Sequence, residues 1–262
     1  MIQLENVSKS YLQNGIWFPP VLAKLNLTVT EGEFLCVLGP SGCGKTTLLN
    51  LIAGFVSPSE GRVLFQGKEI RGPGPDRGVV FQDATLFPWL TVMQNVGFGL
   101  RIRGMKGRLF KETTIGFLET MGLAEHAEKF PYALSGGMRQ RVAIARVLAL
   151  EPKVLLMDEP FSALDANTRE RLQDELLKVW MLHRRTIVYI THSVEETAYL
   201  ADRVVVFGGT DAGLVADLPV SLKRPRQRND NEFIAMKDHL RKCLAEQPCC
   251  IQPQTLTGER NQ

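Results

Sequence analysis

The chain has 262 residues, which leaves room for one large domain or two small ones. Its 31 Lys and Arg residues nearly balance its 28 Asp and Glu residues, so the net charge of +3 does not by itself indicate nucleic-acid binding. Hydrophobic residues make up 44% and charged residues 23% of the chain, as in an ordinary globular protein. This composition excludes disorder of the whole chain.

Apolar stretches in this sequence are short compared with the ~20 residues that cross a bilayer. Residues 1–5 lack the basic and then apolar pattern of a secretory signal. The five cysteines are odd in number and show neither a CxxC framework nor zinc-site spacing. We therefore expect a chain that stays in the cytoplasm, does not cross a membrane by itself and keeps its thiols reduced.

Apolar runs of strand length recur along the chain, at 34–38, 62–65, 79–81, 154–157, 187–190 and 204–207. Several are nearly continuous, as in strands that are covered on both faces. Residues 167–183 follow helical spacing, and Asp165 or Asn167 is placed to cap the first turn. This strand, helix, strand order predicts a parallel sheet with right-handed crossovers, and hence an α/β fold.

The middle of the chain, residues 91–128, has few strand-like runs and predicts helices that are broken by Gly104, Gly107, Gly116 and Gly122. Beyond residue 208 the sequence predicts a solvated basic segment at 223–228 and one helix at 232–244. The last residues of the chain are expected to fray.

The segment 39–46 fits the pattern GxxxxGK[ST] and lies between a predicted strand and a helical run. It consists of Gly39, Pro40, Ser41, Gly42, Cys43, Gly44, Lys45 and Thr46. Glycines in such a loop let backbone N–H groups turn towards phosphate oxygens, and the helix that follows presents its positive end. Lys45 is placed to reach the outer phosphates, and the Thr46 hydroxyl to ligate Mg²⁺. The pattern predicts a P-loop; a merely structural Gly-rich turn is the alternative.

Asp158 and Glu159 directly follow an apolar strand, so their carboxylates are expected at the edge of the sheet where ligands of α/β proteins bind. Asp158 is suited to the shell of a Mg²⁺ ion. Glu159 is placed to orient and polarise a water for attack on the γ-phosphate. Alone, the pair could equally cap a strand end, but beside a P-loop the catalytic interpretation is favoured.

Another small-residue turn precedes a basic helical run at 134–140, with the sequence LSGGMRQ. Ser135 and the amides of Gly136 and Gly137 are suited to a further phosphate contact at a helix start. A single nucleotide has no obvious need for both this turn and the P-loop.

The order of these motifs resembles the ATP-binding cassette ATPase family: P-loop, Gln82 after a strand, LSGG, Asp158-Glu159, SALD at 162–165 and the lone His192. The resemblance implies an α/β P-loop NTPase core with a mainly parallel sheet, an antiparallel β subdomain and an inserted helical subdomain at about 88–145. This ATPase domain would span 1–215, and residues 216–262 would form a C-terminal extension with one helix.

The resemblance also implies a head-to-tail homodimer that binds two ATP molecules, each between the P-loop of one subunit and LSGG of the other. By position, Gln82 would serve catalysis, sense Mg²⁺ and contact the transporter, and His192 would contact the γ-phosphate. Tyr11 would stack on adenine, Thr47 would join the nucleotide-binding set, and Asp165 would communicate across the dimer.

Some of these residues have ordinary alternatives. Tyr11 could be a partly buried aromatic residue, since 12–20 has the character of a lengthened loop, and a lone His is often structural. Trp89 could belong to a groove for a partner's helix or to the core. Cys43 could simply be a small residue that fits its position.

The segments 38–55 and 72–82 and the Phe-Pro-Trp that follows look like importer ATPases for nitrate, sulfonates and taurine. The resemblance implies a peripheral subunit on the cytoplasmic face of the inner membrane, with a membrane permease and, indirectly, a solute-binding protein as partners and no nucleic acid. Uptake of another small solute, such as a pyrimidine precursor, stays open. A soluble cassette ATPase and a P-loop phosphotransferase are the remaining alternatives.

Overall fold

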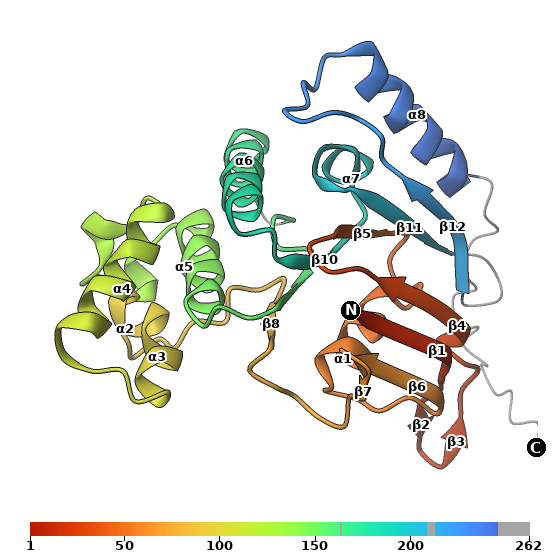
Figure 1. Cartoon of the computed structure of the whole chain (residues 1–262), viewed down its shortest axis with the longest axis horizontal. Helices are drawn as coiled ribbons and strands as arrows, with labels where there is room; N and C mark the ends of the chain where they lie inside the picture. The colour runs from red at the N-terminus through yellow and green to blue at the C-terminus, as the bar shows by residue number, and fades with distance from the viewer. Residues whose placement is uncertain (163, 209–212, 246–262) are drawn as a thin grey trace, which may run out of the picture.

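The computed structural model describes residues 1–162, 164–208 and 213–245. A six-stranded sheet forms its centre, in the order β12-β11-β5-β10-β9-β8 (Figure 1). Its strands are β5 (Phe34–Leu38), β8 (Arg77–Val80), β9 (Val154–Asp158), β10 (Thr186–Thr191), β11 (Arg203–Gly208) and β12 (Gly213–Pro219). All neighbouring pairs are parallel except β11 with β12. The predicted α/β fold with a mainly parallel sheet is confirmed.

The central sheet separates two hydrophobic cores, which explains why its strands are continuously apolar. All residues of β5 are buried, and its side chains alternate between the cores: Phe34 and Cys36 on one face, Leu35 and Val37 on the other. A strand that is covered on both faces favours apolar side chains, and a polar one there needs a hydrogen-bond partner.

An antiparallel sheet packs against one of these cores, in the order β4-β1-β6-β7. Its strands are β1 (Ile2–Lys9), β4 (Leu22–Val29), β6 (Glu60–Phe65) and β7 (Lys68–Glu69). The apolar run 62–65 therefore belongs to this sheet. The short strands β2 (Leu12–Gln13) and β3 (Ile16–Trp17) pair as a hairpin within the segment expected to be a lengthened loop.

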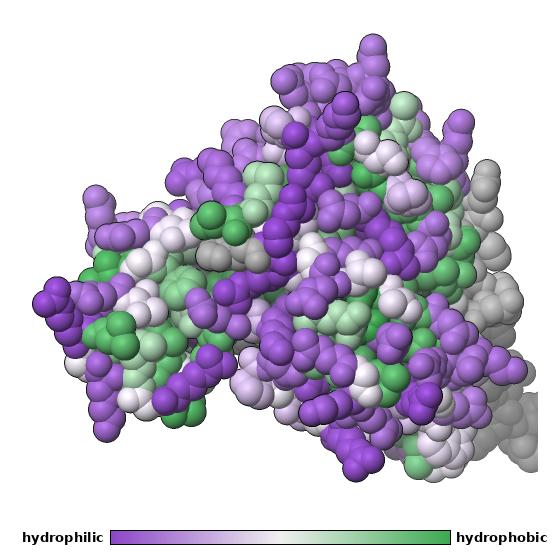
Figure 2. Space-filling view, viewed as in Figure 1, coloured by the Kyte–Doolittle hydropathy of each residue, from purple (hydrophilic) through white to green (hydrophobic). Residues whose placement is uncertain are grey.

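Short helices at the left of Figure 1 form the helical subdomain. They are α2 (Val92–Val96), α3 (Phe98–Ile102), α4 (Gly107–Thr120) and α5 (Gly136–Leu148). The expectation that Gly116 breaks a helix is wrong, because Gly116 lies inside α4 and a Cβ there would meet no neighbouring atom. The surface in Figure 2 is mostly hydrophilic, with hydrophobic patches over this subdomain.

Helices α1 (Lys45–Ala53), α6 (Ala166–His183), α7 (Val194–Leu200) and α8 (Asn231–Ala245) complete the described part of the chain. The expected boundary at residue 215 falls inside β12, so the last strand of the central sheet reaches into the segment expected to be an extension. None of the described helices combines the length and apolarity needed to span a bilayer.

The expectation of a solvated basic segment at 223–228 is wrong for its arginines, although Lys223 is exposed. Arg226 is only 8% exposed and donates to the backbone carbonyls of Ala198 and Tyr199 at the end of α7, both at 3.0 Å. Burial lowers the pKa of Arg226 to about 10. Arg224 donates to Asp202 over 2.6 Å and lies over the ring of Trp180. Helix-terminal carbonyls need donors, and this segment supplies them.

Candidate nucleotide-binding and hydrolysis site

The P-loop connects β5 to α1, as its motif predicts. Gly42 and Gly44 have φ angles of 81° and 95°, a left-handed conformation that glycine adopts without strain. Pro40, Ser41, Gly42 and Thr46 are exposed, whereas Cys43, Gly44, Lys45 and Thr47 are buried. The loop thus offers one exposed face at the N-terminus of a helix, where backbone N–H groups and the helix dipole favour an anion.

Gly39 is required by close packing at the base of the loop. A Cβ added at Gly39 would lie 2.5 Å from the carbonyl oxygen of Phe207 and 2.8 Å from Sγ of Cys43. Any larger residue at this position would displace the loop from β11.

The ammonium group of Lys45 is held inside the loop. Its Nζ donates to the carbonyl oxygens of Gly39 and Pro40 over 2.9 and 2.6 Å, and the residue is only 5% exposed. Carbonyl dipoles solvate the charge but do not neutralise it, and phosphate oxygens make stronger hydrogen bonds with an ammonium group. Lys45 is therefore placed as a buried cation at the mouth of an anion site.

Thr46 and Asp158 meet across the gap between α1 and the end of β9. The Thr46 hydroxyl donates to Oδ2 of Asp158 over 3.0 Å. Burial raises the pKa of Asp158, and the hydrogen bond from Thr46 opposes that change. Mg²⁺ is commonly held by one or two protein oxygens together with phosphate oxygens and waters. This hydroxyl and carboxylate fit that requirement, although the described residues contain no cluster of three or more His, Cys, Asp or Glu that would form an all-protein metal site.

Glu159 and His192 lie together at the carboxyl edge of β9 and β10. Nδ1 of His192 is 3.0 Å from Oε2 of Glu159, and the backbone N–H of Glu159 donates to Ile190 over 3.0 Å. This distance lets Nδ1 of His192 donate to the carboxylate of Glu159. The side chain of His192 is 58% exposed and that of Glu159 16% exposed. Glu159 has a φ of 42°, an unusual conformation for a residue with a side chain and typical of functional sites.

Gln82 and Tyr11 lie near the P-loop and the end of β9 but belong to other segments of the chain. Gln82 is exposed and follows β8, which runs parallel to β9, so it lies at the same edge of the sheet as Asp158. The Tyr11 hydroxyl is 3.5 Å from Oγ1 of Thr47, in the first turn of α1. Its ring is 38% exposed, and Nζ of Lys9 lies over it.

The LSGG turn and Asp165 form a separate surface. Ser135 caps α5, with its Oγ accepting from Met138, and Asp165 caps α6 by accepting from Thr168 over 3.0 Å. Hydrogen bonding to Thr168 lowers the pKa of Asp165. The lining of a cavity of about 300 Å³ includes Ser135, Gly136, Gly137 and Asp165, and no P-loop residue. The predicted site residues thus fall into a P-loop group and a second group around LSGG.

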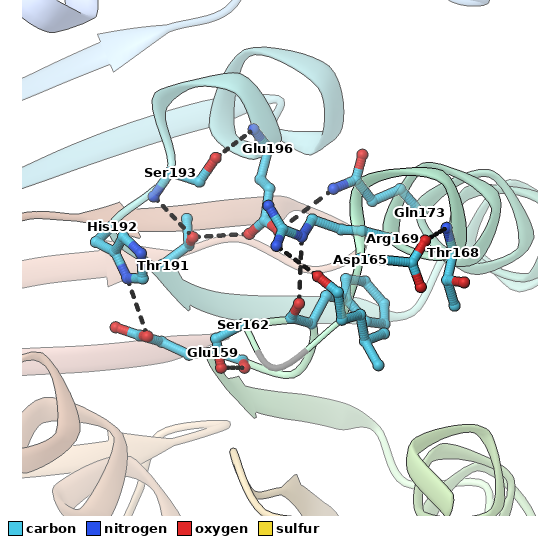
Figure 3. A network of polar contacts seen from close by, with 12 residues as sticks. Glu159, Ser162, Asp165, Thr168, Arg169, Gln173, Thr191, His192, Ser193 and Glu196 are labelled. Atoms are coloured by element: carbon cyan, nitrogen blue, oxygen red, sulfur yellow. Dashed lines mark hydrogen bonds and ion pairs between the residues drawn. The ribbon is translucent and has the colours of Figure 1, made fainter. Parts of the chain in front are cut away.

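Sequence reasoning missed a polar network behind Glu159 and His192 (Figure 3). Its members Arg169 and Glu196 lie on α6 and α7, and Glu196 is only 5% exposed. The only signal in the sequence was a pair of charged residues on otherwise ordinary helices.

A P-loop on a parallel sheet, with carboxylates at the carboxyl edge, defines a nucleotide-hydrolysing enzyme of the P-loop class. The model of the family described as ABC transporter matches residues 22–162 of this chain. The chain therefore belongs to the ABC transporter family, and it is an ATPase whose hydrolysis is coupled to transport.

Similar proteins cover almost the whole chain. An uncharacterized ABC transporter ATP-binding protein of Methanocaldococcus jannaschii, MJ0412, is 48% identical over 94% of this chain and 92% of its own length. The bicarbonate transport ATP-binding protein CmpD of Synechocystis is 47% identical, over 87% of this chain and 82% of its own. The taurine import ATP-binding protein TauB of Pseudomonas aeruginosa is 49% identical, over 84% of this chain and 83% of its own.

A solved structure shares the fold. The ATP-binding cassette MJ0796, described as a dimer in a post-hydrolysis state with bound ADP and Pi, superposes with a TM-score of 0.76. It is 32% identical, and the alignment covers 85% of this chain and all of that one.

Proposed function

We propose that this chain is the ATP-hydrolysing subunit of an importer for a small oxyanion or sulfonate, such as taurine, an alkanesulfonate or nitrate. The observation that carries the catalytic part of this proposal is that two directly contacting pairs, Thr46 with Asp158 and Glu159 with His192, lie at the edge of the sheet next to the P-loop that holds Lys45. The names of TauB and CmpD support the solute class, since both refer to transport of small anionic or zwitterionic molecules.

In this proposal the P-loop amides and Lys45 bind the phosphates of ATP, and Tyr11 stacks on the adenine. Glu159 orients the attacking water and accepts its proton. The hydrogen bond from Nδ1 of His192 to Glu159 leaves Nε2 directed to the γ-phosphate. Thr46 and Asp158 hold Mg²⁺, with Gln82 nearby, and the ion supplies charge neutralisation for the transferred phosphoryl group.

Two copies of the chain form the complete site. The surface around Ser135, Gly136, Gly137 and Asp165 is separate from the P-loop, and two capped helix starts place backbone N–H groups on it. A helix start is suited to the γ-phosphate of a nucleotide that is bound by another copy. The dimeric state of MJ0796 supports a dimer of this chain, and the separate LSGG surface favours a head-to-tail arrangement.

A groove next to Gln82 is the proposed docking site for a permease helix. The groove has a volume of about 570 Å³, and Phe81, Phe87, Phe98 and Ile102 contribute to its lining. Trp89 packs against Phe87 at a ring distance of 5.7 Å and is 70% exposed, too exposed for a core residue. An aromatic groove beside an exposed Trp is suited to an amphipathic helix. Docking there would hold the chain at the cytoplasmic face of the membrane, with a solute-binding protein as an indirect partner.

The test of hydrolysis is Glu159→Gln, which keeps the shape of the side chain but removes the base. We expect turnover to fall by about 10²- to 10⁴-fold, the usual contribution of a general base, while ATP still binds and the dimer is trapped. Near-normal turnover in this variant would contradict the assigned base.

The test of the partner is co-expression with a candidate permease. The chain should then enter the membrane fraction, and Trp89→Ala should reduce that association. Recovery only in the soluble fraction would favour a soluble cassette ATPase.

A further inference from the structure

A buried carboxylate, Glu196, lies behind the candidate hydrolysis site without touching the P-loop. It is in the first turn of α7 and is only 5% exposed. Its Oε2 accepts from Oγ1 of Thr191 over 2.7 Å and from the hydroxyl of Tyr189 over 3.0 Å. Its Oε1 accepts from Nε2 of Gln173 over 3.3 Å and lies 3.8 Å from Nε of Arg169. Such a carboxylate costs free energy to bury unless its partners are fixed.

The donors around Glu196 are held in one orientation. Burial, and then the nearby carboxylate, raises the pKa of Tyr189 well above its usual value, so its phenol stays protonated and donates. Oε1 of Gln173 accepts from Arg228 over 2.9 Å, which directs the amide nitrogen of Gln173 to Glu196. These fixed donors hold the carboxylate of Glu196 in one orientation.

One side of this network fixes the turn that carries His192. Thr191, directly before His192, donates to Glu196, and its own Oγ1 accepts from the backbone N–H of Ser193, directly after His192, over 3.0 Å. Ser193 in turn accepts from the backbone N–H of Glu196 over 3.3 Å. The backbone on both sides of His192 is therefore tied to Glu196 (Figure 3).

The other side fixes Phe161 and Leu164, which lie between Glu159 and Asp165 in the chain. The guanidinium group of Arg169 donates to the carbonyl oxygens of Phe161 over 3.2 Å and of Leu164 over 2.7 Å. It also lies against Glu196, so one planar group holds a loop from β9 and a carboxylate from α7 at the same time. Arginine suits this role because its donors form a rigid fork.

We infer that Arg169 and Glu196 are a pair of positioning residues that holds the His192 turn in register with the loop from Glu159 to Asp165. The inference rests on the proposed roles of Glu159 and His192 in hydrolysis. Neither member of the pair touches ATP; they act through the backbone that places the base, the histidine and Asp165. A change in the pair moves reacting groups relative to one another without changing the P-loop.

The test compares Glu196→Gln with a matched control in the purified full-length protein. Glu196→Gln keeps the shape but removes the charge that faces Arg169. We expect kcat to fall by about 10- to 100-fold, since a misplacement of the order of 1 Å costs up to about 10²-fold. The affinity for ATP, measured without turnover, should stay unchanged. The control is Glu33→Gln, because Glu33 is also buried and ion-paired, with Arg203 over 3.0 Å, at the opposite end of β5. The control should lower the melting temperature without lowering kcat.

Arg169 supplies the second arm of the test. Arg169→Lys keeps the charge but loses the fork, and we expect it to reduce kcat as strongly as Arg169→Met. The double variant Arg169→Met with Glu196→Gln should lose no more activity than the more severe single variant, because the residues act as one unit.

Three results would overturn the pair. The first is a normal kcat in Glu196→Gln. The second is a loss of kcat in Glu33→Gln as large as that in Glu196→Gln. The third is additive losses of kcat in the double variant. Glu159→Gln separates the two proposals. If Glu159→Gln is inactive and Glu196→Gln fully active, the positioning role fails alone; if Glu159→Gln is fully active, the proposed function fails.

Discussion

Thr46 and Asp158 are separated by 112 positions in the chain, yet a hydrogen bond of 3.0 Å joins their side chains. Thr46 lies in the first turn of the helix α1, and Asp158 ends the strand β9. The fold thus brings the expected Mg²⁺ ligands together.

Asp158→Asn should stabilise the protein in the absence of nucleotide. Burial raises the pKa of Asp158, so the folded state favours its neutral form. The protonated Asp158 carboxyl group therefore stabilises the folded state at low pH, and this stabilisation is lost as the pH rises through the raised pKa. The variant should therefore melt higher than the wild type at pH 7, and the difference should shrink as the pH falls. Scanning calorimetry at several pH values measures both effects.

The same variant should lose the extra stabilisation that MgATP gives the wild type, because the Mg²⁺ ligand is gone. A lower melting temperature at pH 7 without nucleotide would contradict the assigned burial cost. Equal stabilisation of both proteins by MgATP would contradict the metal role.

Lys45→Ala should weaken nucleotide binding itself. The buried ammonium group donates to two carbonyl oxygens and lies near Sγ of Cys43, all weaker acceptors than phosphate oxygens. Hydrogen bonds to charged groups contribute about 1.5–3 kcal/mol, which corresponds to an increase in Kd of about 10- to 100-fold. Equilibrium binding of a fluorescent ATP analogue measures the change, and an unchanged Kd would discredit the phosphate-binding role.

Alkylation of Cys43 should block nucleotide binding, and ATP should protect the thiol. Cys43 is 5% exposed, and its Sγ lies 3.8 Å from Nζ of Lys45. An added group at this position would intrude on the anion site. Labelling with N-ethylmaleimide followed by mass spectrometry measures the rate, with Cys43→Ala as the control. Equal labelling rates with and without ATP would refute the prediction.

Ser135→Arg should prevent ATP-induced dimerisation without weakening ATP binding to the single chain. Ser135 is exposed at the start of α5 and lines a cavity apart from the P-loop, so a large side chain there obstructs a partner, besides removing the cap of α5. Analytical ultracentrifugation in the Glu159→Gln background, with MgATP, detects the dimer. Thr120→Arg, at the exposed end of α4, is a surface control. A normal dimer in Ser135→Arg would contradict the proposed interface.

Contiguous features of the site could be predicted because local chemistry determines them. The P-loop needs glycines, a cation and a helix start in one segment, and the apolar strand before Asp158 and Glu159 indicates which edge of the sheet they occupy. Strands β5, β9, β10 and β11 were predicted for the same reason, since each is buried on both faces.

Long-range polar contacts could not be predicted in this way. The basic segment at 223–228 has the composition of a solvated surface, but Arg226 is buried because the end of α7 presents carbonyl groups that need donors. Nothing in the local sequence of α6 or α7 indicates that Arg169 and Glu196 meet.

The sequence by itself determined the chemistry of this protein: which residues can hold phosphate, which can hold a metal and which can activate water. Only the tertiary structure decided how these groups are placed relative to one another, and that LSGG and Asp165 form a surface apart from the P-loop. The physical reason is that residue type and spacing specify local conformation and hydrogen-bonding capacity. The partner of a buried charge, by contrast, depends on which elements pack together.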